Sequence, residues 1–210
     1  MAKGPFPDAA LEPPRRADWR KRCSRRQALL LGLGAYLLPG GAEAESAVPY
    51  ALQAQLMAKV ASYDRRFRER NGGRVLVLLV SRKGSPESAQ VAQQVKAALG
   101  ELPTVGDLPH QEEVVQFDGA DGLARLARDR RAGIVYLGPD LDGDVAAIRR
   151  ALAPARLLTV GAVPDYVSAG IVLGFDLVSG KPKLLVHLTA AREQGIEFRS
   201  DVLRLMKVVG

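Results

Sequence analysis

An almost uninterrupted apolar run, RVLVLLV at residues 74–80, limits the folds open to this chain more than any other segment. A strand with one face in water alternates apolar and polar side chains, and this run shows no such alternation. A strand of this kind is covered on both faces, which is typical of a parallel sheet with helices above and below it. The run therefore predicts a central strand of such a sheet.

Helices and strands alternate after this run. We expect the next helix to begin with Ser85 as its N-cap and Pro86 at its first position, because a Ser side chain accepts from free N–H groups and Pro has no N–H to leave unpaired. Such alternation predicts an α/β fold with an open, mostly parallel sheet flanked by helices. The further elements predicted here are a strand at 114–117, a helix at 123–132, a strand at 134–137, a helix at 144–152 and a strand at 157–160.

An amphipathic helix is predicted before the first strand. Its apolar side chains recur at intervals of three or four residues, and an Asn-Gly-Gly sequence closes it. The apolar positions are Leu52, Leu56, Val60, Tyr63 and Phe67.

The last third of the chain departs from this alternation. Two apolar segments, 171–178 and 184–188, flank a turn in which Gly180 can adopt positive φ. Pro182 cannot donate to a strand ladder, so we expect it in the turn. These features predict an antiparallel C-terminal hairpin, followed by a terminal helix at 201–209.

The N-terminus has the organisation of an export signal. Arg25 and Arg26 precede an uncharged apolar run of 11 residues at 28–38, and Ala42 and Ala44 occupy the positions expected of a cleavage site. The apolar run is too short to span a bilayer, which takes roughly 20 residues. We therefore expect export followed by cleavage, with the paired arginines favouring the twin-arginine over the general secretory route.

Removal of residues 1–44 would leave 45–210 as a single domain in the periplasm. The signal carries eight Lys/Arg and four Asp/Glu, so its loss lowers the net charge from +7 to about +3. A nucleic-acid-binding function thereby loses its main support. The one cysteine, Cys23, leaves with the signal, so the remaining domain depends on its apolar core and not on a disulfide.

Two arginine clusters remain in this domain. Both are interleaved with acidic residues and lie at the ends of predicted helices, where cations complement the helix dipole. We interpret them as solvated faces. They consist of Arg65, Arg66, Arg68 and Arg70, and of Arg128, Arg130 and Arg131.

Two acidic or glycine-rich motifs could hold a ligand, and each has a simpler interpretation. The sequence DLDGD at 140–144 has alternate carboxylates like a calcium loop, but it lacks the Gly and the Glu that such a loop needs at its sixth and twelfth positions. We expect a turn in which Asp142 or Asp144 caps the next helix. The sequence FDGADGL at 117–123 matches neither phosphate-binding spacing, and we expect Gly122 to relieve a tight turn.

Catalytic or metal-binding side chains are scarce. His110 and His187 are the only histidines, which argues against a zinc site once the cysteine is gone. We expect His110 in a loop and His187 in an apolar strand. Ser168 lacks the context of a hydrolase nucleophile. We therefore expect no enzyme activity, no metal and no cofactor.

A series of short segments in the C-terminal half has a recognisable order. They are Val160-Gly161, 164–170, 171–175, 186–188, 190–192 and 195–205. In this order they resemble the YfiR family of exported proteins. The resemblance is close over 156–210 and looser over the preceding βα half.

The resemblance implies a small, non-enzymatic α/β protein of the periplasm that binds the sensor region of a membrane signalling protein. For the family the implied partner is a membrane diguanylate cyclase, whose c-di-GMP synthesis is repressed. A sensor kinase is a second candidate partner, and a homodimer is left open. On the hairpin and the C-terminal helix, the candidate partner-binding residues are Tyr166, Phe175, Phe198 and Leu205.

A second hypothesis is a single-lobe relative of the periplasmic solute-binding proteins, associated with a transporter. The turn before a hairpin at 163–175 permits this interpretation. A full solute receptor closes two lobes around its ligand, and residues 45–210 have room for only one.

Overall fold

The apolar run that dominates the sequence forms the central part of the sheet. The structure, a computed structural model, describes residues 48–210, in which β1 (Val75–Arg82) pairs in parallel with β2 (His110–Phe117) and β3 (Ile134–Leu137). Helices cover both faces of β1, as predicted for a run without alternation. Val75, Val77 and Leu79 enter the core on one side of the sheet, and Leu78 and Val80 enter the core on the other.

The predicted export signal, with Arg25, Arg26, Ala42 and Ala44, lies outside the described residues. Its cleavage and its export route stay predictions. In the part of the chain that the structure does describe, no helix is long and apolar enough to cross a membrane.

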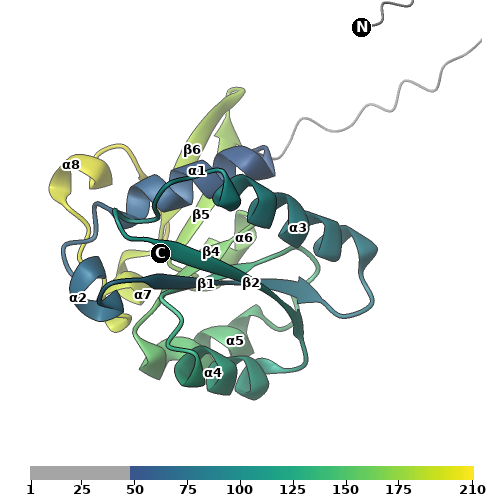
Figure 1. The fold of residues 1–210 in the computed structure, drawn as a ribbon. Coiled ribbons are helices and arrows are strands. Elements are labelled where there is room, and N and C mark those ends of the chain that lie inside the picture. The colour runs from purple at the N-terminus through teal and green to yellow at the C-terminus, as the bar shows by residue number, and fades with distance from the viewer. Residues whose placement is uncertain (1–47) are drawn as a thin grey trace, which may run out of the picture. The chain divides into compact units, whose positions relative to one another are not determined.

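The sheet of residues 48–210 has seven strands in the order β2-β1-β3-β4-β5-β6-β7 (Figure 1). All neighbouring strands run parallel except β5 and β6, which form an antiparallel hairpin. The predicted fold class is therefore confirmed. The remaining strands are β4 (Leu158–Gly161), β5 (Leu173–Val178), β6 (Lys181–Val186) and β7 (Lys207–Val208).

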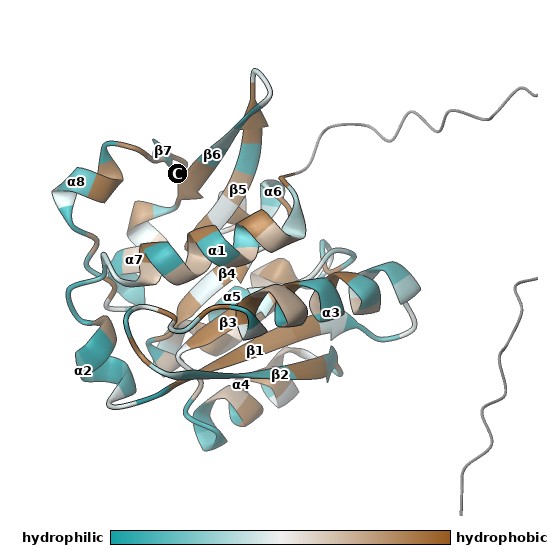
Figure 2. Cartoon of the chain, turned by 45° about the horizontal axis from the view of Figure 1, so that its top comes forward, coloured by the Kyte–Doolittle hydropathy of each residue, from teal (hydrophilic) through white to brown (hydrophobic). Residues whose placement is uncertain are grey.

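Helices form a layer on each side of this sheet. On one side, α1 (Tyr50–Ala61) and α3 (Pro86–Gly100) pack on the strands, and on the other α4 (Ala120–Asp129) and α5 (Val145–Leu152) do so (Figure 1). In Figure 2, β1 is hydrophobic over most of its length, whereas the short α2 (Phe67–Asn71) is mostly hydrophilic. Between β3 and β5 the chain also forms a 3-10 helix (Ala153–Ala155) and α6 (Asp165–Ser168).

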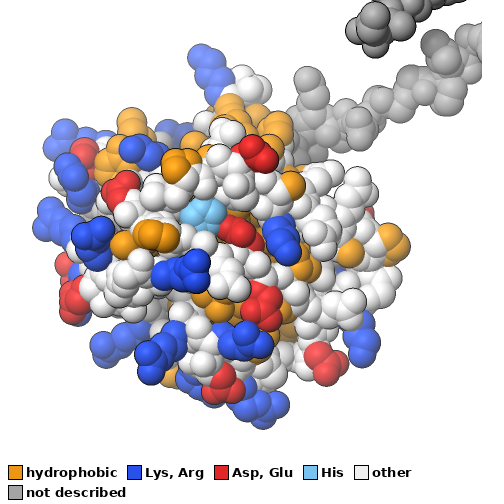
Figure 3. All heavy atoms as spheres, in the orientation of Figure 1, with side chains coloured by type: hydrophobic (Ala, Val, Ile, Leu, Met, Phe, Trp, Pro, Cys, Tyr) orange, Lys and Arg blue, Asp and Glu red, His pale blue; other side chains and the backbone are white. Residues whose placement is uncertain are grey.

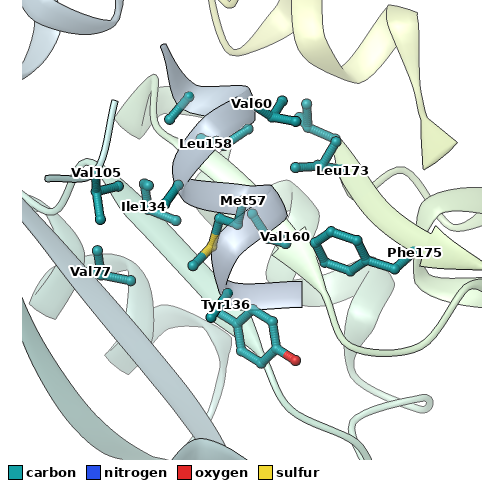
Figure 4. Packing of buried hydrophobic residues seen from close by; sticks show 14 of the residues in the cluster. Met57, Val60, Val77, Val105, Ile134, Tyr136, Leu158, Val160, Leu173 and Phe175 are labelled. Carbon is teal, nitrogen blue, oxygen red and sulfur yellow. The ribbon is translucent and has the colours of Figure 1, made fainter. Parts of the chain in front are cut away.

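The core under α1 is built around side chains from four elements. Figure 4 shows Met57 of α1 above the sheet, with Tyr136 of β3, Val160 of β4 and Phe175 of β5 around it. The Tyr136 hydroxyl donates to the buried side chain of Gln53 at 2.8 Å. Burial raises the pKa of Tyr136 well above its usual range, so this phenol stays neutral inside the core.

The start of α3 has the predicted capping. The Ser85 hydroxyl accepts from the Ser88 N–H at 3.0 Å, and Pro86 occupies the first turn. The buried Ser88 hydroxyl in turn accepts from the Arg82 N–H and donates to the Pro139 carbonyl, both at 2.9 Å. These bonds join the ends of β1 and β3 to the first turn of α3.

The single helix predicted from Leu52 to Phe67 is wrong. The structure has α1 ending at Ala61, a turn, and then the separate helix α2. Asp64 causes the break, because its buried carboxylate pairs with Arg70 and accepts from the Arg66 N–H and the Glu197 N–H, both at 3.1 Å. A buried carboxylate needs hydrogen-bond donors in place of water. In a continuous helix, the Asp64 side chain would lie too far from the Glu197 N–H to accept from it.

The C-terminal prediction is right about the hairpin and wrong about the segment after it. Gly180 has the expected positive φ of 71°, but Pro182 lies within β6, opposite Leu177. The predicted helix at 201–209 is reduced to α8 (Ser200–Leu203), because the chain then extends into β7 and pairs with β6. A helix that the sequence interpretation missed, α7 (Leu188–Glu193), comes directly after the hairpin.

Candidate partner-binding surface

A groove lies between α7 and the segment that carries α8. The His187 ring begins α7 by accepting from the Ala190 N–H at 3.1 Å, and Gly195, at a φ of 66°, turns the chain away after the helix. The groove has a volume of about 360 Å³. Its lining is formed by Arg65, Leu188, Ala191, Arg192, Ile196, Glu197, Phe198, Ser200 and Leu203.

Three large apolar side chains outside the groove lining are exposed to solvent. Leu205 is 66 % exposed and Val208 is 50 % exposed, and both come shortly after α8. Val178, at the end of β5 in the hairpin, is 44 % exposed. We call Leu188, Phe198, Leu203, Leu205 and Val208 together the α7–α8 surface.

Backbone hydrogen bonds fix the segment that presents this surface. The Arg65 N–H donates to the Glu197 carbonyl at 3.0 Å, and the Arg199 N–H donates to the Tyr63 carbonyl at 2.9 Å. Further along, the Val209 N–H donates to the Val186 carbonyl at 2.9 Å. The segment that carries α8 is therefore hydrogen-bonded to the α1–α2 turn at one end and to β6 at the other. These bonds hold the backbone of its apolar residues in place.

The four residues predicted to contact a partner lie in two different environments. Tyr166 and Phe175 are buried, with only 1 % and 2 % of their surface exposed, so their assignment to a surface is wrong. Tyr166 packs in the core with α4 and α5, and Phe175 in the core under α1. Phe198 lines the groove, and Leu205 is exposed two residues after the end of α8.

Tyr166 organises the carboxyl end of the sheet. Its hydroxyl accepts from the Leu141 N–H at 2.9 Å and donates to the Asp142 carboxylate at 3.5 Å. Burial is the main cause that raises the pKa of Tyr166 to about 12 from its usual 10.0, and the negative charges of Asp142 and Asp140 add to it. The neutral phenol is therefore the form that the fold stabilises.

A raised tyrosine pKa predicts a loss of stability at alkaline pH. The contribution of Tyr166 should be complete below pH 10 and should be lost as the pH rises through about 12, because the unfolded chain releases that proton first. Phenolate absorbance followed against pH should show one late-titrating tyrosine fewer in Tyr166→Phe, in which the buried Tyr136 still titrates late. If the two proteins give the same titration curve, Tyr166 is not shielded as the structure indicates.

The predicted side-chain cap from the acidic motif at 140–144 is not formed by Asp144. Asp144 stands just before α5 without a capping hydrogen bond from its side chain. Within residues 48–210 no group of three or more metal-binding side chains is close enough to hold an ion. The carboxylates have separate protein partners: Asp140 accepts from Ser85, Asp142 from Tyr166, and Asp144 pairs with Arg82.

The other predicted motifs also have structural roles. In the glycine-rich segment, Gly119 and not Gly122 adopts the positive φ, at 101°. His110 begins β2 instead of lying in a loop, and its ring contacts Glu112 and the Leu102 carbonyl. His187 caps α7 instead of lying in a strand. Ser168 ends α6.

Residues 50–207 match the family model described as YfiR/HmsC-like. The chain belongs to the YfiR/HmsC-like family. The match includes the βα half of the domain, where the sequence resemblance was looser. YfiR/HmsC-like proteins form a periplasmic regulatory family, and their regulation implies an interaction with a membrane signalling protein. A comparison with curated proteins gives no match.

Several solved structures share this fold. A conserved domain protein from Vibrio cholerae O1 biovar eltor superposes with a TM-score of 0.55 at 15% identity, covering 77% of this chain and 60% of that one. An ABC domain in complex with L-Trp from Streptococcus pneumoniae gives a TM-score of 0.54 at 10% identity, covering 75% and 62%. A ligand-free, open substrate-binding protein with adhesive properties from Clostridium difficile gives 0.51 at 9% identity, covering 64% and 54%.

These similarities concern the fold alone. The chain covers between 54% and 62% of the length of the three structures, so it corresponds to a part of each. The α7–α8 surface therefore has to be interpreted from its own residues.

Proposed function

We propose that residues 1–44 are removed on export and that the remaining domain binds the periplasmic sensor region of a membrane signalling protein through the α7–α8 surface. In this proposal the partner is a membrane diguanylate cyclase, and binding holds it in its inactive conformation. The protein then lowers c-di-GMP synthesis without catalysing a reaction itself. A sensor kinase is the alternative partner of the same kind.

The observation that carries this proposal is the groove lined by Leu188, Phe198 and Leu203, together with the exposed Leu205 and Val208 in the segment that follows α8. Apolar side chains gathered on a surface mark interaction sites, and a stable interface has an apolar centre inside a polar rim. Leu205 is the most exposed of the large apolar side chains in residues 48–210, at 66 %. Arg65, Arg192 and Glu197 supply the polar rim of the groove.

The carboxyl end of the sheet supports this proposal over a solute-binding function. Open parallel sheets bind small ligands where the strand order reverses, here between β1 and β3. The polar groups at that place are already paired with one another, since Ser85 donates to Asp140 and Arg82 pairs with Asp144. A small ligand would have to replace these bonds, whereas a protein partner on the α7–α8 surface leaves them intact.

A charge placed on the α7–α8 surface tests the proposal. We expect Leu205→Arg to weaken binding to the purified sensor region of the cyclase by about 30-fold or more, which is about 2 kcal/mol, because the interface would lose an apolar contact and would have to desolvate a charge. Titration calorimetry measures the affinity, and c-di-GMP in cells carrying the variant should rise.

Val178→Arg is the matched control, because it places the same charge on another exposed apolar residue away from α8. It should bind as the unchanged protein does. If Val178→Arg abolishes binding and Leu205→Arg does not, the surface is wrongly assigned. If the protein binds sensor kinases but no cyclase, the proposed partner is wrong and the surface is retained.

A further inference from the structure

Arginine side chains gather where the parallel strands begin. The last turns of α2 and α4 lie at this end of the sheet, and two open hollows of about 440 and 290 Å³ share Arg70, Asn71 and Arg131 in their walls. Figure 3 shows Lys and Arg side chains gathered over the α2 and α4 side of the molecule. We call the arginines that line the two hollows the arginine edge: Arg70, Arg74, Arg128, Arg130, Arg131 and Arg156.

Most of this charge is not neutralised by the protein. Arg70 pairs with the buried Asp64, and Arg130 lies 3.5 Å from Glu113. Among residues 48–210, no carboxylate lies within 4.0 Å of the other four guanidinium groups, and all four arginines are exposed. Those four are Arg74, Arg128, Arg131 and Arg156.

Helix dipoles do not account for the whole cluster. A cation in the last turn of a helix is stabilised by the carbonyl end of the dipole, and Arg128 of α4 has that position. Arg74, Arg131 and Arg156 lie outside the α-helices. Arg131 and Arg156 have left-handed backbone conformations, with φ of 53° and 50°, because each lies where a helix ends: Arg131 shortly after α4, and Arg156 directly after the 3-10 helix.

Guanidinium groups are suited to phosphate, because their planar donors form paired hydrogen bonds with its oxygens. The arginine edge spreads over two open hollows instead of converging on one enclosed site, so it matches a surface that carries many phosphates. We infer that the arginine edge binds the phosphate groups of anionic phospholipids and holds the protein on a membrane surface. This goes beyond the proposed partner contact and does not depend on it.

The position of α2 connects this inference to the α7–α8 surface. The Arg70 guanidinium donates to the Gly195 carbonyl at 3.0 Å, and Arg66 lies 3.6 Å from Glu197. Gly195 comes shortly after α7, and Glu197 lines the groove. A protein held on a bilayer by its arginine edge would therefore carry the groove close to the place where a membrane protein's sensor region emerges.

Vesicle binding tests the inference with the protein alone. We expect the purified protein to sediment with vesicles of phosphatidylcholine mixed with phosphatidylglycerol but not with vesicles of phosphatidylcholine alone. Added salt should release the protein from the mixed vesicles, because it screens the attraction between charges. Each arginine near an anionic surface contributes about fivefold to binding, so the double variant Arg131→Gln/Arg156→Gln should bind about 25-fold more weakly. Thermal unfolding checks that it is folded.

A double variant with the same change in net charge serves as the control. Lys96→Gln/Lys181→Gln removes two exposed cations from α3 and the hairpin and should leave vesicle binding unchanged. Equal losses in both variants would mean that only net charge matters, and the inference would fail. It would also fail if inorganic phosphate raised the melting temperature while the vesicles bound nothing, since the ligand would then be a soluble phosphate. The sensor-region titration contains no vesicles, so the two proposals can fail separately.

Discussion

Replacement of Asp64 by alanine should lower the free energy of unfolding by about 3–5 kcal/mol, because it leaves the largely buried Arg70 guanidinium without its counter-ion. The Asp64 side chain is completely buried and that of Arg70 is only 12 % exposed. The same carboxylate accepts from the Arg66 and Glu197 N–H groups, so three donors lose their acceptor together. Urea unfolding followed by circular dichroism measures the change.

Glu69→Ala is the matched control, since it removes a carboxylate from α2 whose ion pair with Arg66 is exposed to solvent. An exposed pair of this kind contributes less than about 1 kcal/mol. A loss on Asp64→Ala no larger than the loss on Glu69→Ala would show that the buried pair does not stabilise the turn between α1 and α2.

Phe175→Ala should also cost about 3–5 kcal/mol of unfolding free energy, since it removes a large buried side chain and leaves a cavity in the core under α1. Phe175 is 2 % exposed and lies with Met57 and Tyr136 in that core (Figure 4). Urea unfolding measures this loss as well. Partner binding by the fraction that remains folded should be unchanged, because Phe175 does not reach the surface.

Leu205→Ala is the contrasting variant. Its side chain is 66 % exposed, so its truncation should change the unfolding free energy by no more than about 0.5 kcal/mol. If Leu205→Ala proved as destabilising as Phe175→Ala, Leu205 would belong to a core, and its assignment to the α7–α8 surface would be wrong.

The βα half of the fold could be predicted because its signals are local. The Ser85-Pro86 start of α3 depends on neighbouring residues, and the strand predicted at 134–137 has the bounds of β3. The two wrong helices depend on distant contacts. The α1–α2 break needs the Asp64 bond to Glu197, and the short α8 results from the pairing of β7 with β6. Neither contact has a sequence pattern of its own.

Two of the four predicted partner-binding residues are buried, and the reason is related. An aromatic residue in a turn or hairpin can face either the solvent or the core, and periodicity does not separate the two cases for Tyr166 and Phe175. Leu188, which lines the groove, was missed because α7 was not expected. The helix-forming stretch from Thr189 to Glu193 before Gly195 was the available signal.

The hydrogen bond from Glu197 to Asp64 joins positions 133 residues apart in the sequence. The buried Asp64, near the beginning of the domain, therefore gains one of its hydrogen-bond donors only after the C-terminal segment has packed. During folding, the α1–α2 turn is not fully stabilised until the C-terminal segment has packed against it. The two ends should consequently open and close as one cooperative unit, with matching amide hydrogen-exchange rates at Arg66 and Glu197.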